Sequence, residues 1–199
     1  MSRFIIRRAK AEDGAALCAI YAPYITDTTI TFEYEVPTDA AFSDRIRETA
    51  AQFPYLVCEK DGGIIGYAYA HRIRERAAYD WDVELSVYLK QGTHGRGIGT
   101  VLLACLIELL EMQGLRHLYS CVTMPNPRSV GMQHRLGFED AGVWHSSGWK
   151  FGAWHDVAWF EKHVGGGEPK PVVPFPELDG DIIQKTLNIY TEKLNLEDK

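Results

Sequence analysis

The stretch Gly95-Arg96-Gly97-Ile98-Gly99-Thr100 lies where a strand-like pattern ends and a helical pattern begins. Before it, apolar and polar residues alternate from Asp80 to Leu89, the period of a half-buried strand. After it, apolar residues recur at i, i+3, i+4 and i+7 as far as Leu110, which predicts a helix. The first N–H groups of a helix have no partners within it and bind anions. The stretch therefore predicts a diphosphate site, to which Arg96 adds positive charge.

The spacing of the glycines narrows the choice of diphosphate. No lysine follows Gly99, as a Walker A loop requires, which argues against a nucleotide triphosphatase. After Gly99 the next glycine is Gly114, so the dinucleotide fingerprint is also incomplete. The alternative interpretation is that these glycines form only a tight turn.

The remaining periodicities predict one α+β domain with no internal repeat. Strands are expected at 4–8, 55–59, 64–71, 79–89, 117–122, 138–146 and 150–163, and helices at 12–25, 39–51, 98–113 and 127–136. Thr38 or Asp39 is expected to cap the second helix, and Asp61-Gly62-Gly63 marks a hairpin turn. Beyond the glycine- and proline-rich stretch 165–176, residues 181–194 read as a short amphipathic helix that docks on the domain or on a partner subunit.

Several motifs, in order over 1–163, resemble one family. They are Thr31-Phe32-Glu33, Tyr79-Asp80-Trp81, Glu84-Leu85-Ser86-Val87-Tyr88, Gly95-Arg96-Gly97-Ile98-Gly99, Pro125-Asn126-Pro127-Arg128-Ser129-Val130, Leu136-Gly137-Phe138 and Gly152-Ala153-Trp154-His155-Asp156-Val157. The chain resembles the GNAT N-acetyltransferases, specifically the phosphinothricin and methionine sulfoximine N-acetyltransferase branch. The glycine loop alone identifies only the superfamily, whereas the combination is specific to the branch.

The resemblance implies a GNAT-type layered fold, with a mixed, mostly antiparallel sheet of about seven strands and about four helices. It implies an N-acetyltransferase domain over 1–164, whereas the linker and short helix over 165–199 extend beyond the usual end of the family. It also implies acetyl-CoA as cosubstrate, a small-molecule primary amine as acceptor and a homodimer. No metal is implied, since the seven histidines show no ligand spacing with Cys, Asp or Glu.

Glu84 is the candidate general base, because an amino-acid amine is protonated at neutral pH and must lose a proton before it attacks a thioester. The family uses a glutamate at the matching position, and burial near Trp81 and Tyr88 is expected to raise its pKa. Asp80 and Asp82 are the competing carboxylates, and the alternative is a surface carboxylate at a strand edge. The predicted cofactor-binding residues are Val87, Tyr88, Leu89, His94, Gly95, Arg96, Gly97, Ile98, Gly99, Thr100 and Asn126. Strand N–H groups around Val87–Leu89 are expected to stabilise the developing oxyanion.

The acceptor is expected to lie against Phe32, Arg74, Arg76 and Tyr79. An arginine pairs bidentately with a carboxylate or phosphinate, which would orient the amine towards Glu84. The alternative for Arg74 and Arg76 is a solvated charge run. Asn126 serves equally well as a helix cap, Arg128 is a weaker candidate near the adenosine phosphates, and His155 and Asp156 are interpreted as structural.

Three positions depart from the family pattern. His94 stands where the loop usually begins with Arg or Gln, which predicts weaker or pH-dependent donor binding. Gln133 stands where the branch has a Tyr or His proposed to protonate the leaving thiolate. Glu33-Tyr34-Glu35 replaces a basic residue near Phe32 and makes phosphinothricin itself a doubtful substrate.

Composition sets outer limits. The chain has 199 residues, 46% of them hydrophobic, enough for one substantial core. Its formal charge of −6 argues against nucleic-acid and anionic-membrane partners, and no apolar run or N-terminal signal region indicates a membrane span or export. The separated cysteines Cys18, Cys58, Cys105 and Cys121 fit buried free thiols in the cytoplasm.

Two alternatives to acetylation of a small amino-acid-like amine stay open. One is an acyl-CoA sensor without turnover, and the other is acetylation of a polyamine or a protein amine.

Overall fold

The computed structural model describes residues 3–197, so Met1 and Ser2 of the N-terminal region and residues 198–199 of the tail lie outside the described part. One seven-stranded sheet has the order β1-β2-β3-β4-β5-β7-β6. All neighbouring strands are antiparallel except β4 and β5, which are parallel. The strands are β1 (Phe4–Arg8), β2 (Tyr55–Lys60), β3 (Gly63–Arg72), β4 (Asp82–Leu89), β5 (His117–Thr123), β6 (Glu139–Lys150) and β7 (Ala153–His163).

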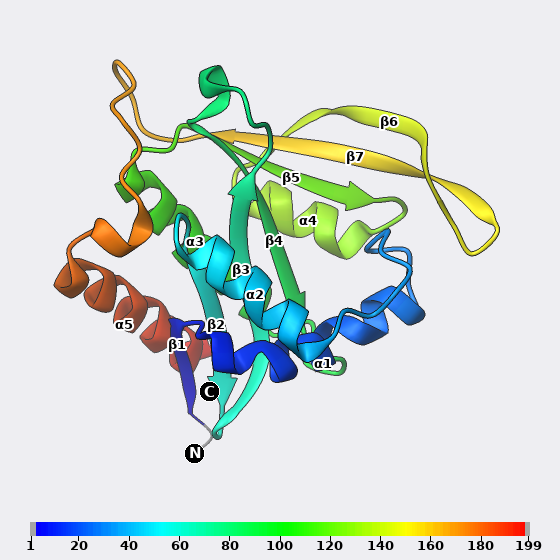
Figure 1. The fold of residues 1–199 in the computed structure, drawn as a ribbon, viewed down its shortest axis with the longest axis horizontal. Coiled ribbons are helices and arrows are strands. Elements are labelled where there is room, and N and C mark those ends of the chain that lie inside the picture. Colours follow the sequence, from blue (N-terminus) through cyan, green and yellow to red (C-terminus); the bar gives the residue numbers. More distant parts are fainter. Residues whose placement is uncertain (1–2, 198–199) are drawn as a thin grey trace.

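Helices cover both faces of the sheet (Figure 1). They are α1 (Gly14–Thr26), α2 (Asp39–Ala50), α3 (Ile98–Gln113), α4 (Pro127–Arg135) and α5 (Gly180–Glu197). On one face α3, α4 and α5 pack on a core of aliphatic side chains, and on the other α1 and α2 cover a smaller core rich in tyrosine. The predicted α+β architecture, with a mixed and mostly antiparallel sheet of seven strands, is confirmed.

The sheet opens in its middle. The parallel ladder between β4 and β5 runs only from Asp82–His117 to Glu84–Tyr119, although both strands continue beyond it. The strands diverge from that point, as Figure 1 shows, and leave a gap that the chain does not fill with another strand. Strand edges at such a gap carry N–H and C=O groups that can pair with an extended ligand.

Most predicted elements are confirmed, with two corrections. The strand predicted over 79–89 begins at Asp82, and Ala77–Tyr79 forms a 3₁₀ turn instead. An ion pair between Arg72 and Asp80 holds this turn, so the alternation of residue types before Asp82 does not continue the ladder. The last hairpin turns at Phe151-Gly152, where both residues have positive φ, so β6 is longer than the predicted 138–146.

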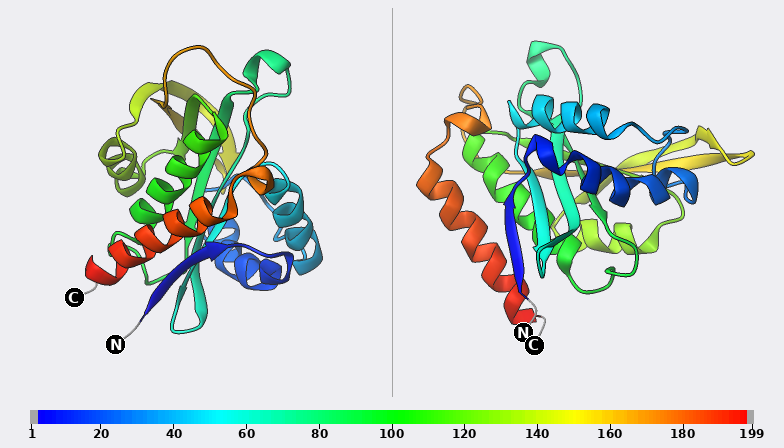
Figure 2. Two further views of the ribbon diagram at one scale, coloured as in Figure 1. Left: turned by 90° about the vertical axis from the view of Figure 1, so that its left-hand side faces the viewer. Right: turned by 60° about the horizontal axis from the view of Figure 1, so that its bottom comes forward.

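The C-terminal helix α5 packs into the main core. Ile183, Leu187, Tyr190 and Leu194 are buried with α3 and β1. Two polar residues of α5 also bond the backbone of the edge strand: Thr191 Oγ1 accepts from Ile6 N at 2.9 Å, and Asn195 both accepts from Phe4 N and donates to Phe4 O at 3.0 Å. The helix therefore covers the edge of β1, as the views in Figure 2 show. Within residues 3–197, no helix has the length and apolarity that crossing a bilayer requires.

Candidate functional site

The glycine loop opens α3 in the way its sequence predicts. Gly95 and Gly97 adopt φ values of 85° and 73°, a region that other residues enter only with strain. Gly97 is the N-cap, and the N–H groups of Ile98, Gly99 and Thr100 follow it at the start of the helix. These donors have no partner within the helix, and the helix dipole adds partial positive charge at the same place.

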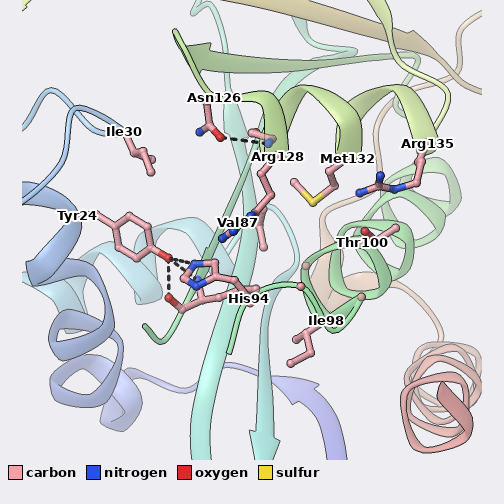
Figure 3. A pocket seen from close by; sticks show the side chains of 15 residues that line it. Tyr24, Ile30, Val87, His94, Ile98, Thr100, Asn126, Arg128, Met132 and Arg135 are labelled. Carbon is pink, nitrogen blue, oxygen red and sulfur yellow. Dashed lines mark hydrogen bonds between the residues drawn. The ribbon is translucent and has the colours of Figure 1, made fainter. Parts of the chain in front are cut away.

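A cavity of about 310 Å³ lies over this helix terminus (Figure 3). Its lining includes nine of the predicted cofactor-binding residues: Val87, Leu89, His94, Gly95, Gly97, Ile98, Gly99, Thr100 and Asn126. The side chain of Arg96 is exposed and lies outside this lining. The side chain of Tyr88 packs edge-on against Tyr21 and Tyr24 of α1, and Tyr88 lines the neighbouring gap.

Tyr24 of α1 connects the loop to the central strand, although the sequence predicted no role for it at the site. Its hydroxyl donates to Leu89 O at 2.6 Å and lies 2.9 Å from His94 Nε2. A hydroxyl has one proton, so the bond to Leu89 O assigns the proton between Tyr24 and His94 to the imidazole Nε2. Burial, and then the charge of Arg128, hold the pKa of His94 below its usual value. His94 therefore carries less positive charge near neutral pH than an ordinary histidine does.

A second cavity, of about 60 Å³, lies in the gap between β4 and β5 and shares Ile30, Val87, Asn126 and Ser129 with the first. Lys90 N donates to Ile65 O of β3 at 2.8 Å, so alternation along β4 turns the N–H groups of Val87 and Leu89 towards the gap. The Leu89 N–H already reaches the Tyr24 hydroxyl at 3.3 Å. Val87 N–H is thus the donor best placed for a carbonyl oxygen in the gap.

Asn126 caps a helix and also lines the first cavity. Its Oδ1 accepts from Ser129 N at 3.1 Å and caps α4. Its amide nitrogen is then available as a donor at the cavity wall, since the carboxamide carries donors and acceptor on different atoms.

Glu84 lies at the last rung of the parallel ladder, where the gap begins. Its side chain is about one-fifth exposed, and burial raises its pKa from 4.5 to about 7. A carboxyl group with this pKa is ionised in about half of the molecules at neutral pH, which suits a general base.

The neighbours of Glu84 differ from those expected. Trp81 lies at the start of the strand, where its Nε1 donates to Lys170 O at 2.6 Å. His71 of β3 is the partner across the ladder, with its Nε2 at 3.8 Å from Glu84 Oε2, and burial lowers its pKa. Burial raises the pKa values of Tyr69 and Cys121, and the charge of Glu84 contributes to both shifts. Both side chains share this face of the sheet with Glu84. Cys121 is exposed, unlike the other three cysteines, so the expectation of four buried thiols is corrected.

The predicted acceptor residues are only partly brought together. Arg74 and Tyr79 line a cavity of about 290 Å³ together with Asp82 and Tyr119. Arg76 is exposed and lines none of the cavities described in this section. The Phe32 ring packs against Gly148, where a Cβ atom would lie 2.2 Å from it, and stacks on His155 at 6.4 Å. It thereby holds the loop after α1 against the last hairpin.

Glu33 and the His155-Asp156 pair make structural contacts. Glu33 accepts two hydrogen bonds from Arg45, at 2.9 and 3.1 Å, and one from Tyr21. His155 Nε2 lies 3.0 Å from Lys150 O, and Asp156 accepts from Ser146 N at 2.8 Å. Across residues 3–197, no group of three or more His, Cys, Asp or Glu side chains is arranged to hold a metal ion.

Helix α4 contributes several cavity residues that the sequence analysis left out. Ser129, Met132 and Arg135 line the first cavity, at the helical spacing that a periodicity search can detect. Gln133 is 2% exposed and lines the gap, and within residues 3–197 its Oε1 has no hydrogen-bond partner. A carboxamide cannot act as a general acid at this place.

Known proteins resemble this chain in sequence and in fold. The acetyltransferase (GNAT) domain family matches residues 6–159. Phosphinothricin N-acetyltransferase of Streptomyces viridochromogenes is 34% identical over 87% of this chain and 95% of its own length. L-methionine sulfoximine/L-methionine sulfone acetyltransferase of Pseudomonas aeruginosa is 34% identical over 80% of this chain and 94% of its own. A phosphinothricin acetyltransferase from Sinorhizobium meliloti, crystallised with acetyl-CoA, superposes with a TM-score of 0.82 at 32% identity, over 86% of this chain and 96% of that one.

Proposed function

The chain belongs to the GNAT acetyltransferase family, and from that premise we propose that it acetylates the primary amine of a small amino-acid-like acceptor, with Glu84 as general base. One observation carries the proposal. The glycine-loop cavity continues into the gap between β4 and β5, and the half-buried Glu84 stands where that gap begins.

The residues present fit acetyl-CoA. The N–H groups of Ile98, Gly99 and Thr100 are suited to the pyrophosphate, and the gap is suited to the pantetheine arm, which would pair with the open edge of β4 like an added strand. Val87 N–H points to where the thioester oxygen would lie and would stabilise the negative charge that develops on it.

The proton balance assigns one task to Glu84. An ammonium acceptor and an acetyl thioester yield an amide, a thiol and one released proton. Glu84 takes the first proton from the ammonium group, so that the neutral amine attacks the carbonyl carbon and the C–S bond breaks. The second amine proton passes to water as the amide forms. The leaving thiolate takes a proton from water in turn, because the Gln133 carboxamide beside the gap is not an acid. These two transfers cancel. Glu84 returns its proton to solvent.

A turnover assay tests this function. We expect the purified chain to release free thiol from acetyl-CoA when it is offered methionine sulfone or other amino acids, and mass spectrometry to find the acetylated amine. A sensor would bind acetyl-CoA in titration calorimetry without releasing thiol for any acceptor. That outcome would refute the enzymatic proposal.

Arg128 is expected to supply the positive charge that His94 lacks. Figure 3 shows Arg128 reaching from α4 into the loop cavity towards Val87, and its charge depresses the pKa of His94. Replacing Arg128 with Ala should raise the Kd for acetyl-CoA by about 10–100-fold, as the loss of a charged hydrogen bond to phosphate does. H94R, which restores the family's charge, should recover most of this loss in the R128A background.

The binding should also depend on pH. A bound pyrophosphate favours the protonated form of His94, so the Kd for acetyl-CoA should fall as the pH falls below 7 towards the lowered pKa of that imidazole. Calorimetry measures binding alone, so the result does not include the loss of activity that protonation of Glu84 causes at low pH.

For the Arg128 prediction, an unchanged Kd for acetyl-CoA in R128A at low salt would contradict the proposed role of Arg128.

We further propose that the enzyme is a cytoplasmic homodimer. Large apolar side chains are exposed on the β6–β7 hairpin, among them Trp149, Phe151 and Trp154, and such a surface supports a subunit contact. The four unpaired cysteines support a reducing compartment. Light scattering should return twice the chain mass of 22.5 kDa.

A further inference from the structure

We infer that the cavity of about 290 Å³ beside Glu84 receives the acceptor, and that it is built for an α-amino acid with an aromatic side chain. The inference rests on the proposed function and adds the class of substrate. Four aromatic rings line this cavity, those of Tyr79, Tyr119, Trp144 and Trp159. They come from four separate segments of the chain that meet at one end of the sheet.

The cavity adjoins the base. Asp82 lies two residues before Glu84 on the same face of β4, a separation of about 7 Å along a strand. Tyr119 is the residue paired with Glu84 across the parallel ladder. Glu84 itself lies outside the lining, but Asp82 and Tyr119 bring the cavity to its neighbours along β4 and across the ladder, so we expect an amine at that end to approach the Glu84 carboxylate.

The charges in the cavity suit a zwitterion. Arg74 lines it and offers a guanidinium to a carboxylate. The other charged residue of the lining, Asp82, is already engaged by His117 Nδ1 at 2.8 Å. An α-amino acid whose carboxylate meets Arg74 therefore meets no unpaired negative charge until its amine reaches Glu84.

The outer wall is apolar and only partly covered. Trp144 and Trp159 pack at 4.8 Å between ring centroids with planes at 50°, while Trp144 keeps about half of its surface exposed. Register shifts on both sides of Trp144 in β6 mark bulges, which turn strand side chains out of the regular ladder. A ligand ring seated here would bury aromatic surface that the protein alone leaves exposed.

The cavity on the other side of Glu84 is less suitable. It measures about 210 Å³, and His71, Tyr69 and Arg45 are among its lining residues. Its arginine is held bidentately by Glu33, so it has no cation available for a carboxylate. The acceptor is thus assigned to the tryptophan side.

A competition between acceptors tests the inference. The full chain is assayed for kcat/KM with L-tryptophan, L-phenylalanine and L-methionine sulfone. We expect the aromatic amino acids to exceed methionine sulfone by about tenfold or more. W144A should lower kcat/KM for the aromatic acceptors by about tenfold, because aromatic contacts of this kind are lost. Methionine sulfone should change by less than about threefold.

Val143→Ala is the matched control. Val143 neighbours Trp144 on β6, is exposed to a similar extent and does not line the cavity. V143A should leave kcat/KM unchanged for the aromatic amino acids and for methionine sulfone. W144F, which keeps a ring in the wall, should retain the aromatic preference and serves as the test if W144A does not fold.

Three outcomes would overturn the inference. Thiol release with methionine sulfone, but none with the aromatic amino acids, would reject the aromatic cavity and leave the proposed function standing. An equal loss for all acceptors in W144A would also reject it, because the wall would then have no selectivity. Absence of thiol release with every acceptor would reject the proposed function as well.

Discussion

Replacing Glu84 with Gln is expected to lower kcat by about 10²–10⁴-fold, the range typical of a lost general base. The carboxamide keeps the size of the side chain and cannot accept a proton from the ammonium group. The Kd for acetyl-CoA should change little, because the loop donors at Ile98, Gly99 and Thr100 are untouched. Thiol release under saturating acceptor measures the effect.

The pH profile gives the same prediction in a second form. Burial raises the pKa of Glu84 to about 7, and the base works only when it is ionised. Activity should therefore fall as the pH drops through about 7, and the residual activity of E84Q should lack this limb.

Stability provides the folding control for E84Q. The folded chain holds the Glu84 proton to a higher pH than the unfolded chain, so stability from this group is lost as pH rises from 4.5 through about 7. E84Q should accordingly be at least as stable as the parent at pH 8, by thermal melting.

D80N is the matched carboxylate control for the loss of kcat, since Asp80 pairs with Arg72 outside the gap. A fully active E84Q with an inactive D82N would transfer the base to Asp82.

Replacing Leu187 with Ala in α5 is expected to reduce the free energy of unfolding by about 2–5 kcal/mol, the usual cost of truncating a buried leucine. Leu187 is 2% exposed and belongs to the same core as α3 and β1. Ile189 lies two residues away, is 40% exposed, and I189A should change stability by less than about 0.5 kcal/mol. Urea titration followed by circular dichroism measures both.

The shape of that titration tests the division of the chain at residue 164. Because α5 shares the main core, we expect one cooperative transition for the whole chain, which shifts as a unit in L187A. A separate early transition, or an L187A variant as stable as the parent, would make the tail an independent appendage.

The sequence predicted the middle of each element better than its ends. The pattern over 98–113 gave α3 its full length, because Gly97 and Gly114 both have the positive φ that favours glycine at a helix boundary. The strand predicted over 79–89 starts three residues too early, because the alternation of residue types continues back into a 3₁₀ turn. The Arg72–Asp80 ion pair beside that turn is a tertiary contact that the alternation does not indicate. The final turn was missed because Phe151 adopts φ 51°, which its residue type does not favour.

The candidate site was predictable where it depends on neighbours in sequence. The loop donors, the cap at Asn126 and the position of Glu84 on β4 follow from local patterns. The contact of Tyr24 with His94 was not predictable, because a tyrosine on an apolar helix stripe resembles any core residue. The same holds for Arg74 and Arg76, of which only Arg74 reaches a cavity next to Glu84.

By itself the sequence determined the strand, loop and helix that form the predicted anion site, since positive φ at Gly95 and Gly97 and the orphan N–H groups of α3 are local properties of the backbone. Tertiary structure alone decided the divergence of β4 from β5, the burial that raises the pKa of Glu84, and the assembly of the tryptophan-lined cavity. Burial and electrostatic environment depend on which distant segments pack together, and no local pattern records that.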